Sequence, residues 1–70
     1  MKLAISIDKG HSLDAVIIED AKMINCVDKN TVIVTYRDPV TTELMDVTIK
    51  HVLMIYDYDF IMNEVVKNAD

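Results

Sequence analysis

Few side chains in this sequence can act as nucleophiles, and their neighbours offer no partner for catalysis. Cys26 is the single cysteine, and the residues beside it, from Ile24 to Val27, include no histidine. Nucleophilic catalysis by Cys26 or Ser12 would require a base, an orienting group and a pocket, and a domain of 70 residues rarely encloses such a pocket. We therefore expect no catalytic residue, and we interpret Cys26 as a small side chain buried in the core.

The potential metal ligands are scattered along the chain. His11 and His51 are the only histidines, and neither belongs to a paired motif of the HxxxH or CxxC type. A site could be assembled in space from these two histidines with Asp8 and Asp14, but metal sites that can be recognised in a sequence have ligands at short, regular spacing. The sequence therefore predicts neither a metal nor a cofactor.

The charge balance is acidic. The chain carries 12 Asp and Glu residues against 7 Lys and Arg residues, a net charge of −5, and its basic residues form no cluster. Nucleic-acid binding depends on basic groups that displace the counterions of the phosphates, so we expect no direct nucleic-acid partner. An acidic surface can be a simple solvated face, or it can imitate a phosphate backbone.

The sequence favours a reducing compartment and no membrane partner. A lone cysteine cannot form a disulfide within the chain. The apolar stretch near the N-terminus is broken at Ser6 and Asp8, which is too early for a signal-peptide core. The longest apolar run, from Val52 to Tyr56, falls far short of the roughly 20 residues that a membrane-spanning helix needs. We therefore expect a soluble cytoplasmic protein.

The apolar content is high for so short a chain. Hydrophobic residues make up 51% of the sequence, and 5 of them are methionines. A chain of this size buries only about 60% of its surface on folding, so its own core gives marginal stability. We expect part of the apolar surface to pack against a protein partner or a second copy, although a tight core that uses all of it is the other interpretation.

The clearest structural pattern is a β-hairpin between residues 31 and 49. Apolar residues alternate with polar ones in 31–37 and again in 44–50, as in strands with one buried face. Asp38 and Pro39 supply the turn, because proline presets φ and aspartate can cap the turn with its carboxylate. Residues 3–8 alternate in the same way, which predicts a first strand.

Residues 12–25 fit two structures. As a helix, the segment would be capped by Ser12 and would present an apolar stripe at helical spacing. As strands, the β-branched run from Val16 to Ile18 would form one strand, Glu19-Asp20 a break, and Lys22 to Val27 a second strand. The strand interpretation is favoured, because the last residue of the β-branched run falls off the helical stripe.

The period of the apolar residues changes near the C-terminus. The continuous apolar run at 52–56 suits a strand that is buried on both faces. Beyond it, apolar side chains follow a three-four spacing, which predicts an amphipathic helix over residues 57–69. Asp57 would cap this helix, and Asp59 would suit its positive end.

These elements together predict one mainly β domain over residues 1–70, with about five to six short antiparallel strands and a C-terminal helix. In hairpin spacing and in the polar interruption before the last strand, residues 14–56 resemble the small SH3-like barrels of Tudor, KOW and Sm-type domains, which implies an antiparallel barrel. No binding motif of these families is matched, since the chain lacks both a basic cluster and tryptophan. The alternative is an α+β fold, with residues 12–25 as a helix packed on a small antiparallel sheet.

The aromatic residues near the C-terminus give the one candidate binding site. Rings alternate with acidic residues from Tyr56 to Phe60, and the start of a helix cannot bury three rings on one side. We predict a protein-binding patch in which aromatic side chains supply contact area within an acidic rim. Its residues are Tyr56, Tyr58, Asp59, Phe60 and Glu64. Phe60 folded back onto the open end of the barrel is the alternative.

The sequence therefore predicts a protein that is not an enzyme, and two functions are open. The first is a small protein-interaction module that acts by self-association, as a homo-oligomer, or by docking on a larger protein. The second is an acidic inhibitor or nucleic-acid mimic, of the kind that phages and mobile elements encode, which occupies a site on a host nucleic-acid-binding enzyme. An apolar interface should tolerate salt, whereas an acidic mimic should bind less tightly as the ionic strength rises.

Overall fold

A computed structural model describes residues 1–59 of the chain, and in this range the chain forms six β-strands. The strands are β1 (Leu3–Asp8), β2 (Leu13–Ile18), β3 (Ala21–Asp28), β4 (Thr31–Arg37), β5 (Leu44–Ile49) and β6 (Val52–Asp57). The prediction of a mainly β fold is confirmed. The predicted helix over 57–69 lies outside the described residues except for its first three, and Asp57 is the last residue of β6.

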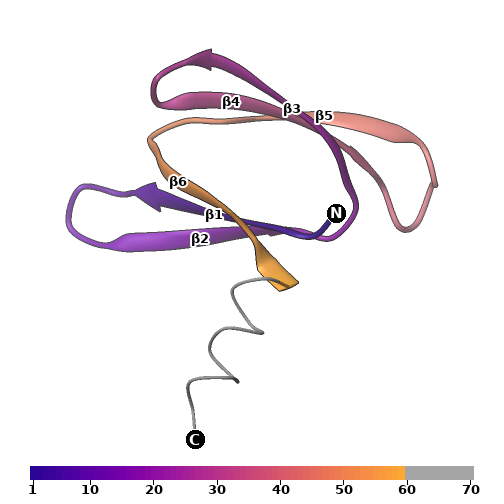
Figure 1. The fold of residues 1–70 in the computed structure, drawn as a ribbon, viewed down its shortest axis with the longest axis horizontal. Coiled ribbons are helices and arrows are strands. Elements are labelled where there is room, and N and C mark those ends of the chain that lie inside the picture. The colour runs from indigo at the N-terminus through magenta and orange to yellow at the C-terminus, as the bar shows by residue number, and fades with distance from the viewer. Residues whose placement is uncertain (60–70) are drawn as a thin grey trace, which may run out of the picture.

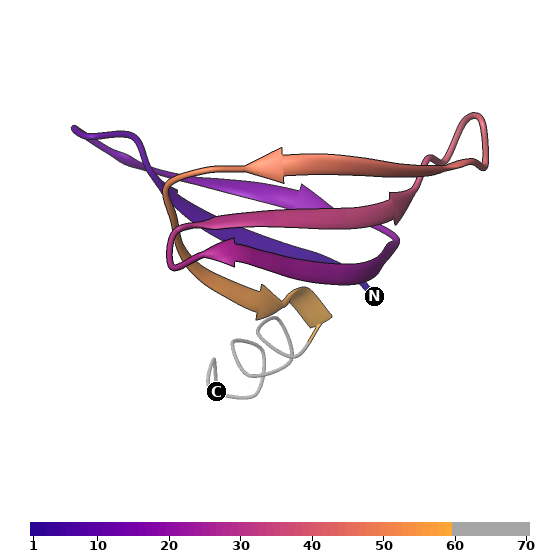
Figure 2. The same cartoon turned by 90° about the horizontal axis from the view of Figure 1, so that it is seen from above.

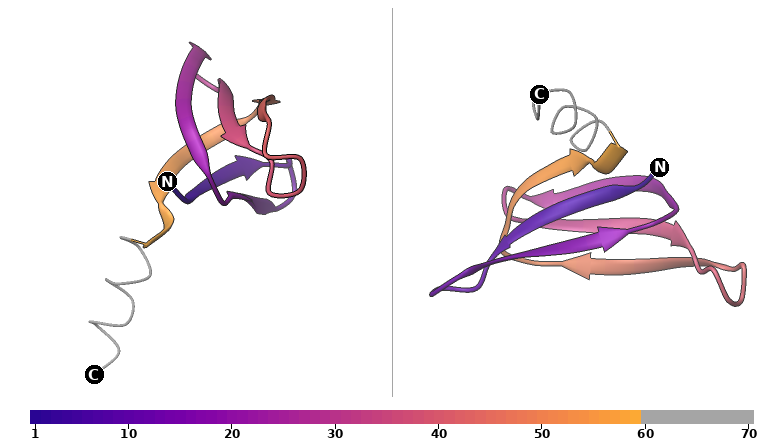
Figure 3. Two further views of the ribbon diagram at one scale, coloured as in Figure 1. Left: turned by 90° about the vertical axis from the view of Figure 1, so that its right-hand side faces the viewer. Right: turned by 90° about the horizontal axis from the view of Figure 1, so that it is seen from below.

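The strands form two antiparallel sheets that lie one above the other (Figures 1 and 3). Sheet A has the strand order β2-β1-β6, and sheet B has the order β3-β4-β5. Figure 2 shows β2 on the same side of the molecule as β5, and β6 on the same side as β3. The chain crosses from one sheet to the other at two short corners, Glu19-Asp20 and Lys50-His51.

The two sheets do not close into the SH3-like barrel that the sequence resemblance implied. Among the six described strands, none from sheet A pairs with one from sheet B. The corners explain this, because each turns the chain out of the plane of its sheet within two residues. A few backbone bonds join the sheets instead, such as those from Ala21 N to Met1 O and from Val52 N to Asn30 O, which are 2.8 and 2.9 Å long.

The core lies between the two sheets and follows the predicted alternation. Val32 and Val34 of β4 are buried, with Tyr36 partly buried on the same face, and Ile5 of β1 is buried from the other sheet. The buried residues are Leu3, Ile5, Ile18, Ala21, Val32, Val34, Ile49 and Val52. They come from both sheets, so the inner face of each sheet is buried only because the other sheet covers it.

Aspartate carboxylates hold three of the turns. Asp38 Oδ1 accepts hydrogen bonds from the backbone N–H groups of Val40, at 2.7 Å, and Thr41, at 3.1 Å, which confirms the predicted capping of the β4–β5 turn. Asp8 and Asp28 accept in the same way from the residue two positions further on, each at 2.8 Å. Such side-chain caps satisfy backbone donors that no strand partner can reach.

Residues 12–25 form strands, as the favoured interpretation predicts, because β2 and most of β3 occupy them, and the alternative of a helix in this segment is wrong. Two further expectations are wrong. Cys26 is exposed rather than buried: it lies opposite Val32, but β3 is an edge strand whose register shifts next to Cys26, so the thiol stays at the rim of the core. The run at 52–56 is not buried on both faces, since Leu53 and Met54 of edge strand β6 are 49% and 55% exposed.

Candidate functional site

Strand β2 is an edge strand with apolar side chains on both faces. Its register with β1 directs Val16 and Ile18 between the two sheets. The alternate residues Leu13, Ala15 and Ile17 point to the outside, where Leu13 is 70% and Ile17 is 43% exposed. Edge strands often carry charged residues on the face that solvent reaches, and β2 has none among its outward residues.

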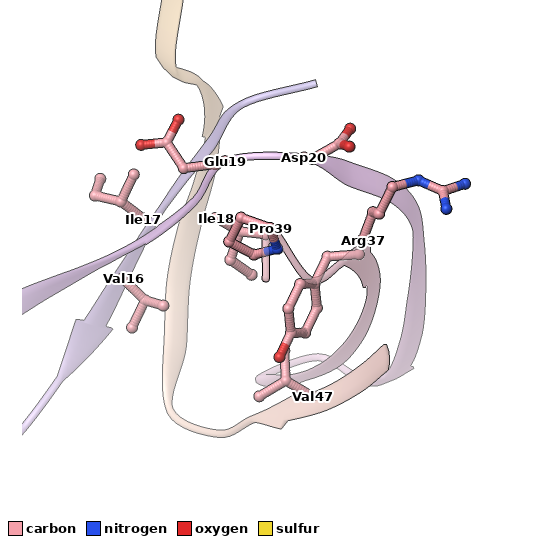
Figure 4. A pocket seen from close by; sticks show the side chains of 9 residues that line it. Val16, Ile17, Ile18, Glu19, Asp20, Arg37, Pro39 and Val47 are labelled. Carbon is pink, nitrogen blue, oxygen red and sulfur yellow. The ribbon is translucent and has the colours of Figure 1, made fainter. Parts of the chain in front are cut away.

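A cleft of about 320 Å³ opens between β2 and sheet B (Figure 4). Its apolar lining comes from Val16, Ile17 and Ile18 of β2, Tyr36 of β4, Val47 of β5 and Pro39 of the turn between them. Its charged lining comes from Glu19, Asp20 and Arg37. Such a cleft can receive an apolar side chain of a partner, with charged groups around the entrance.

The carboxylates at the two ends of β2 are paired with lysines of the same chain. Lys22 Nζ lies 2.9 Å from Asp20 Oδ1, and the hydrogen bond from Lys22 is the main reason that the pKa of Asp20 is lowered. Lys9 Nζ lies 3.0 Å from Asp14 Oδ2, and its hydrogen bond likewise lowers the pKa of Asp14. Both groups are therefore ionised at neutral pH, with their charge partly balanced.

The apolar outer surface of β2 continues across sheet A. The strand registers place Ala4 between Ile17 and Tyr56, and they place Ser6 between Ala15 and Met54 in the next row. The Tyr56 hydroxyl donates a hydrogen bond to Met54 Sδ at 3.1 Å. Small residues on the central strand and larger apolar ones on the edge strands thus give sheet A an exposed outer face.

The outer face of sheet B is mixed. In β4 and β5 the outward positions include Thr35, Asp46 and Thr48, and the Thr35 hydroxyl donates to Asp46 Oδ1 at 2.7 Å. The same face also carries Ile33, which is partly buried, and Met23 and Leu44, which are 59% and 57% exposed. The outward residues of β2 differ because all of them are apolar, and β2 is the strand where this surface meets the cleft.

The structure places part of the predicted partner-binding patch on the same outer face. Tyr56 and Tyr58 are both partly buried there, and Lys2 Nζ lies 4.0 Å from the ring centroid of Tyr58. Asp59 follows and is exposed. The remaining two residues, Phe60 and Glu64, lie outside the described residues.

Sequence reasoning did not identify β2 as a site. Leu13 and Ile17 belong to residues 12–25, whose sequence fits a helix as well as a strand, and the two structures place these side chains on different faces. The composition of β2 is the signal that could have identified the site. Five of its six residues are apolar, so apolar side chains must lie on both faces of the strand. A strand of that kind at an edge leaves one apolar face uncovered.

The described residues offer no obvious centre for chemistry. Within residues 1–59, no group of three or more His, Cys, Asp or Glu side chains is placed to hold a metal ion. No helix in the same range has the length and apolar character that crossing a membrane requires. Comparison of the chain with known proteins finds no matching family model, curated protein or solved structure.

Proposed function

We propose that this protein is a non-enzymatic protein-interaction module that acts by self-association, with two copies meeting at the β2 side. We define the β2 side as strand β2, its outward residues Leu13, Ala15 and Ile17, and the adjoining cleft. The observation that supports the proposal best is that this edge strand presents apolar side chains on both faces. A second copy brings the same apolar strand and is therefore a chemically matched occupant.

The energetic argument concerns the size of the domain. Burying a fully exposed leucine or isoleucine side chain contributes about 1.5–3 kcal/mol, and Leu13 and Ile17, which are 70% and 43% exposed, can each gain a part of that. The whole folding stability of a small domain is about 5–15 kcal/mol. Covering these two side chains in both copies would therefore contribute an energy comparable to part of the stability of one chain, before the cost of association is subtracted.

The predicted aromatic patch extends this surface. Tyr56 belongs to the same row as Ile17 across sheet A, and Tyr58 lies at the end of that face beside Lys2. A partner that covers the β2 side can reach these rings by crossing the small residues of β1. We keep Asp59, Phe60 and Glu64 in the proposed surface as the continuation of the chain from Tyr58.

The acidic-mimic hypothesis has less support. A phosphate mimic needs carboxylates that are available to a basic partner. Around the β2 side, Asp14, Glu19 and Asp20 are each within ion-pair distance of a lysine of the same chain, at 3.0, 3.5 and 2.9 Å. Their charge is partly balanced already, so self-association is the function that we retain.

The test is the molar mass of the full chain as a function of concentration, measured by light scattering at low and at high salt. We expect a dimer at high protein concentration under both conditions, because an apolar interface is little affected by salt. Ile17→Lys should shift the chain to the monomer. Thr48→Lys is the matched control, since it adds the same charge to an exposed residue on the outer face of the other sheet. A monomer at all concentrations, or equal effects of the two variants, would overturn the proposal.

A further inference from the structure

The four edge strands of the two sheets differ in regularity. The register of β3 shifts at two places, so that Lys22 and Val27 are extra residues, and the register of β6 shifts where Leu53 is extra. Bulges of this kind twist an edge strand and hinder pairing with another chain. The registers of β2 and β5 contain no shift. Of these two regular edges, β5 has Asp46 and Thr48 on its outer face beside the exposed Leu44, whereas β2 has only apolar residues there.

Alternate residues of β2 direct their backbone N–H and C=O groups away from β1, toward the unpaired edge. Asp8 N donates to His51 O at 2.9 Å, so Asp8 directs its backbone away from β2. Because hydrogen-bonded and non-hydrogen-bonded pairs alternate in an antiparallel sheet, the residues of β1 that bond β2 are Leu3, Ile5 and Ile7. Their partners in β2 are Ile18, Val16 and Asp14. The other three residues of β2, Leu13, Ala15 and Ile17, direct their N–H and C=O groups toward the unpaired edge.

The side chain of Asp14 forms a hydrogen bond at the unpaired edge of β2. Asp14 Oδ1 accepts a hydrogen bond from Ala15 N at 2.8 Å, which fits an N–H group that points away from β1. The same carboxylate contacts Lys9 through its other oxygen. Asp14 can therefore keep its ion pair with Lys9 when Ala15 N turns to a different acceptor.

We infer that two copies pair through β2 in an antiparallel manner, with Ala15 opposite the partner's Ala15 and Leu13 opposite the partner's Ile17. This inference rests on the proposed function, and it specifies the geometry of the self-association. The register uses all three outward-directed residues and places the exposed Leu13 and Ile17 side chains of the two copies against each other. It also places Glu19 opposite the partner's His11, and it brings no like charges opposite one another, which would be unfavourable. Sheet A of one copy becomes continuous with sheet A of the other.

Disulfide cross-linking tests the register. In a Cys26→Ser background, Ala15→Cys would place two thiols at the two-fold axis, where the Cα atoms of a hydrogen-bonded antiparallel pair are about 5.5 Å apart, within the range for a disulfide. We expect oxidation to give a covalent dimer with this variant. We also expect a mixture of Leu13→Cys and Ile17→Cys chains to cross-link to each other, whereas Leu13→Cys chains alone should not. Thr48→Cys in the same background is the control for random collision.

The outcomes separate this inference from the proposed function. If light scattering shows a dimer and Ala15→Cys cross-links no better than Thr48→Cys, the β2 pairing is wrong while self-association stands. If Leu13→Cys chains cross-link with themselves, the register is wrong. If the chain is a monomer at every concentration, both proposals fall. Circular dichroism of each reduced variant establishes that the strands are retained, and Ala15 is exposed, so its replacement by cysteine should not disturb the core.

Discussion

Ile5 in β1 and Val34 in β4 are both completely buried, each with 0% of its surface exposed, and they belong to the same core cluster. Each lies on the central strand of its sheet. The two sheets are therefore held together mainly by side chains packed between them, since only a few backbone bonds connect the sheets, and the largest fully buried side chains belong to the middle strands.

Truncating one of these residues should be costly. Ile5→Ala should lower the free energy of unfolding by about 2–5 kcal/mol, the usual range for a buried isoleucine that leaves a cavity. Ile33→Ala is the matched control, because Ile33 neighbours Val34 on the same strand but points to the outer face of sheet B. Urea unfolding would measure both. Equal losses of stability would contradict the assignment of the core to the space between the sheets.

The reactivity of Cys26 tests whether β3 is an exposed edge strand, which the sequence did not predict. Its thiol is exposed in the structure, so a small thiol reagent should modify it fully in the folded protein, without denaturant. The measurement is the rate of modification in native buffer and in urea. A rate that rises steeply with urea would show that Cys26 is buried, as the sequence analysis predicted.

The sequence predicted the strands well because their alternation is a local property. Residues 3–8 and 31–37 form strands with the predicted bounds, and Asp38 caps its turn as expected. The preference for strands over a helix in residues 12–25 was also correct. In a strand, successive side chains point to opposite faces of the sheet, so the order of residues in the sequence shows which of them share a face.

The arrangement of the strands and the β2 side could not be predicted in the same way. Whether β2 pairs with β1 alone or also with β3 depends on the direction of the chain at the Glu19-Asp20 corner. Two polar residues in a sequence do not reveal whether the next strand joins the same sheet or the other one. Cys26 and Met54 illustrate the consequence: both are predicted to be buried, yet both are exposed because their strands are at edges. Edge position is a property of the whole sheet.

Thr42 has a backbone conformation that is unfavourable for its residue type. Its φ is 62°, in the left-handed region, which a β-branched side chain rarely adopts. Thr42→Asn should raise the unfolding free energy by roughly 0.5–1 kcal/mol, because asparagine tolerates this region. Thr41→Asn is the control at the neighbouring position, where φ is not positive. A lower melting temperature for Thr42→Asn would contradict the argument from strain.

The ion pair of Asp20 makes stability depend on pH in a defined direction. The hydrogen bond from Lys22 holds the pKa of Asp20 below its usual value of 3.8 in the folded state. The contribution is therefore present above pH 3.8 and is lost as the pH falls through the lowered pKa of the folded state. Lys22→Met should be less stable than the native chain near neutral pH, and the difference should shrink in acid. Lys29→Met, which removes a lysine that makes no ion pair within residues 1–59, should show no such convergence.

The central claim is that copies of this chain meet at the β2 side, and amide hydrogen exchange at several protein concentrations tests it most directly. The outward-directed amides of Leu13, Ala15 and Ile17 should exchange more slowly as the concentration rises, because a second copy supplies backbone acceptors, which for Ala15 replace the exposed Asp14 carboxylate. The amides of edge strand β5 should keep their exchange rates. Exchange at the three β2 amides that does not change with concentration, or protection that appears at β5 instead, would contradict the claim.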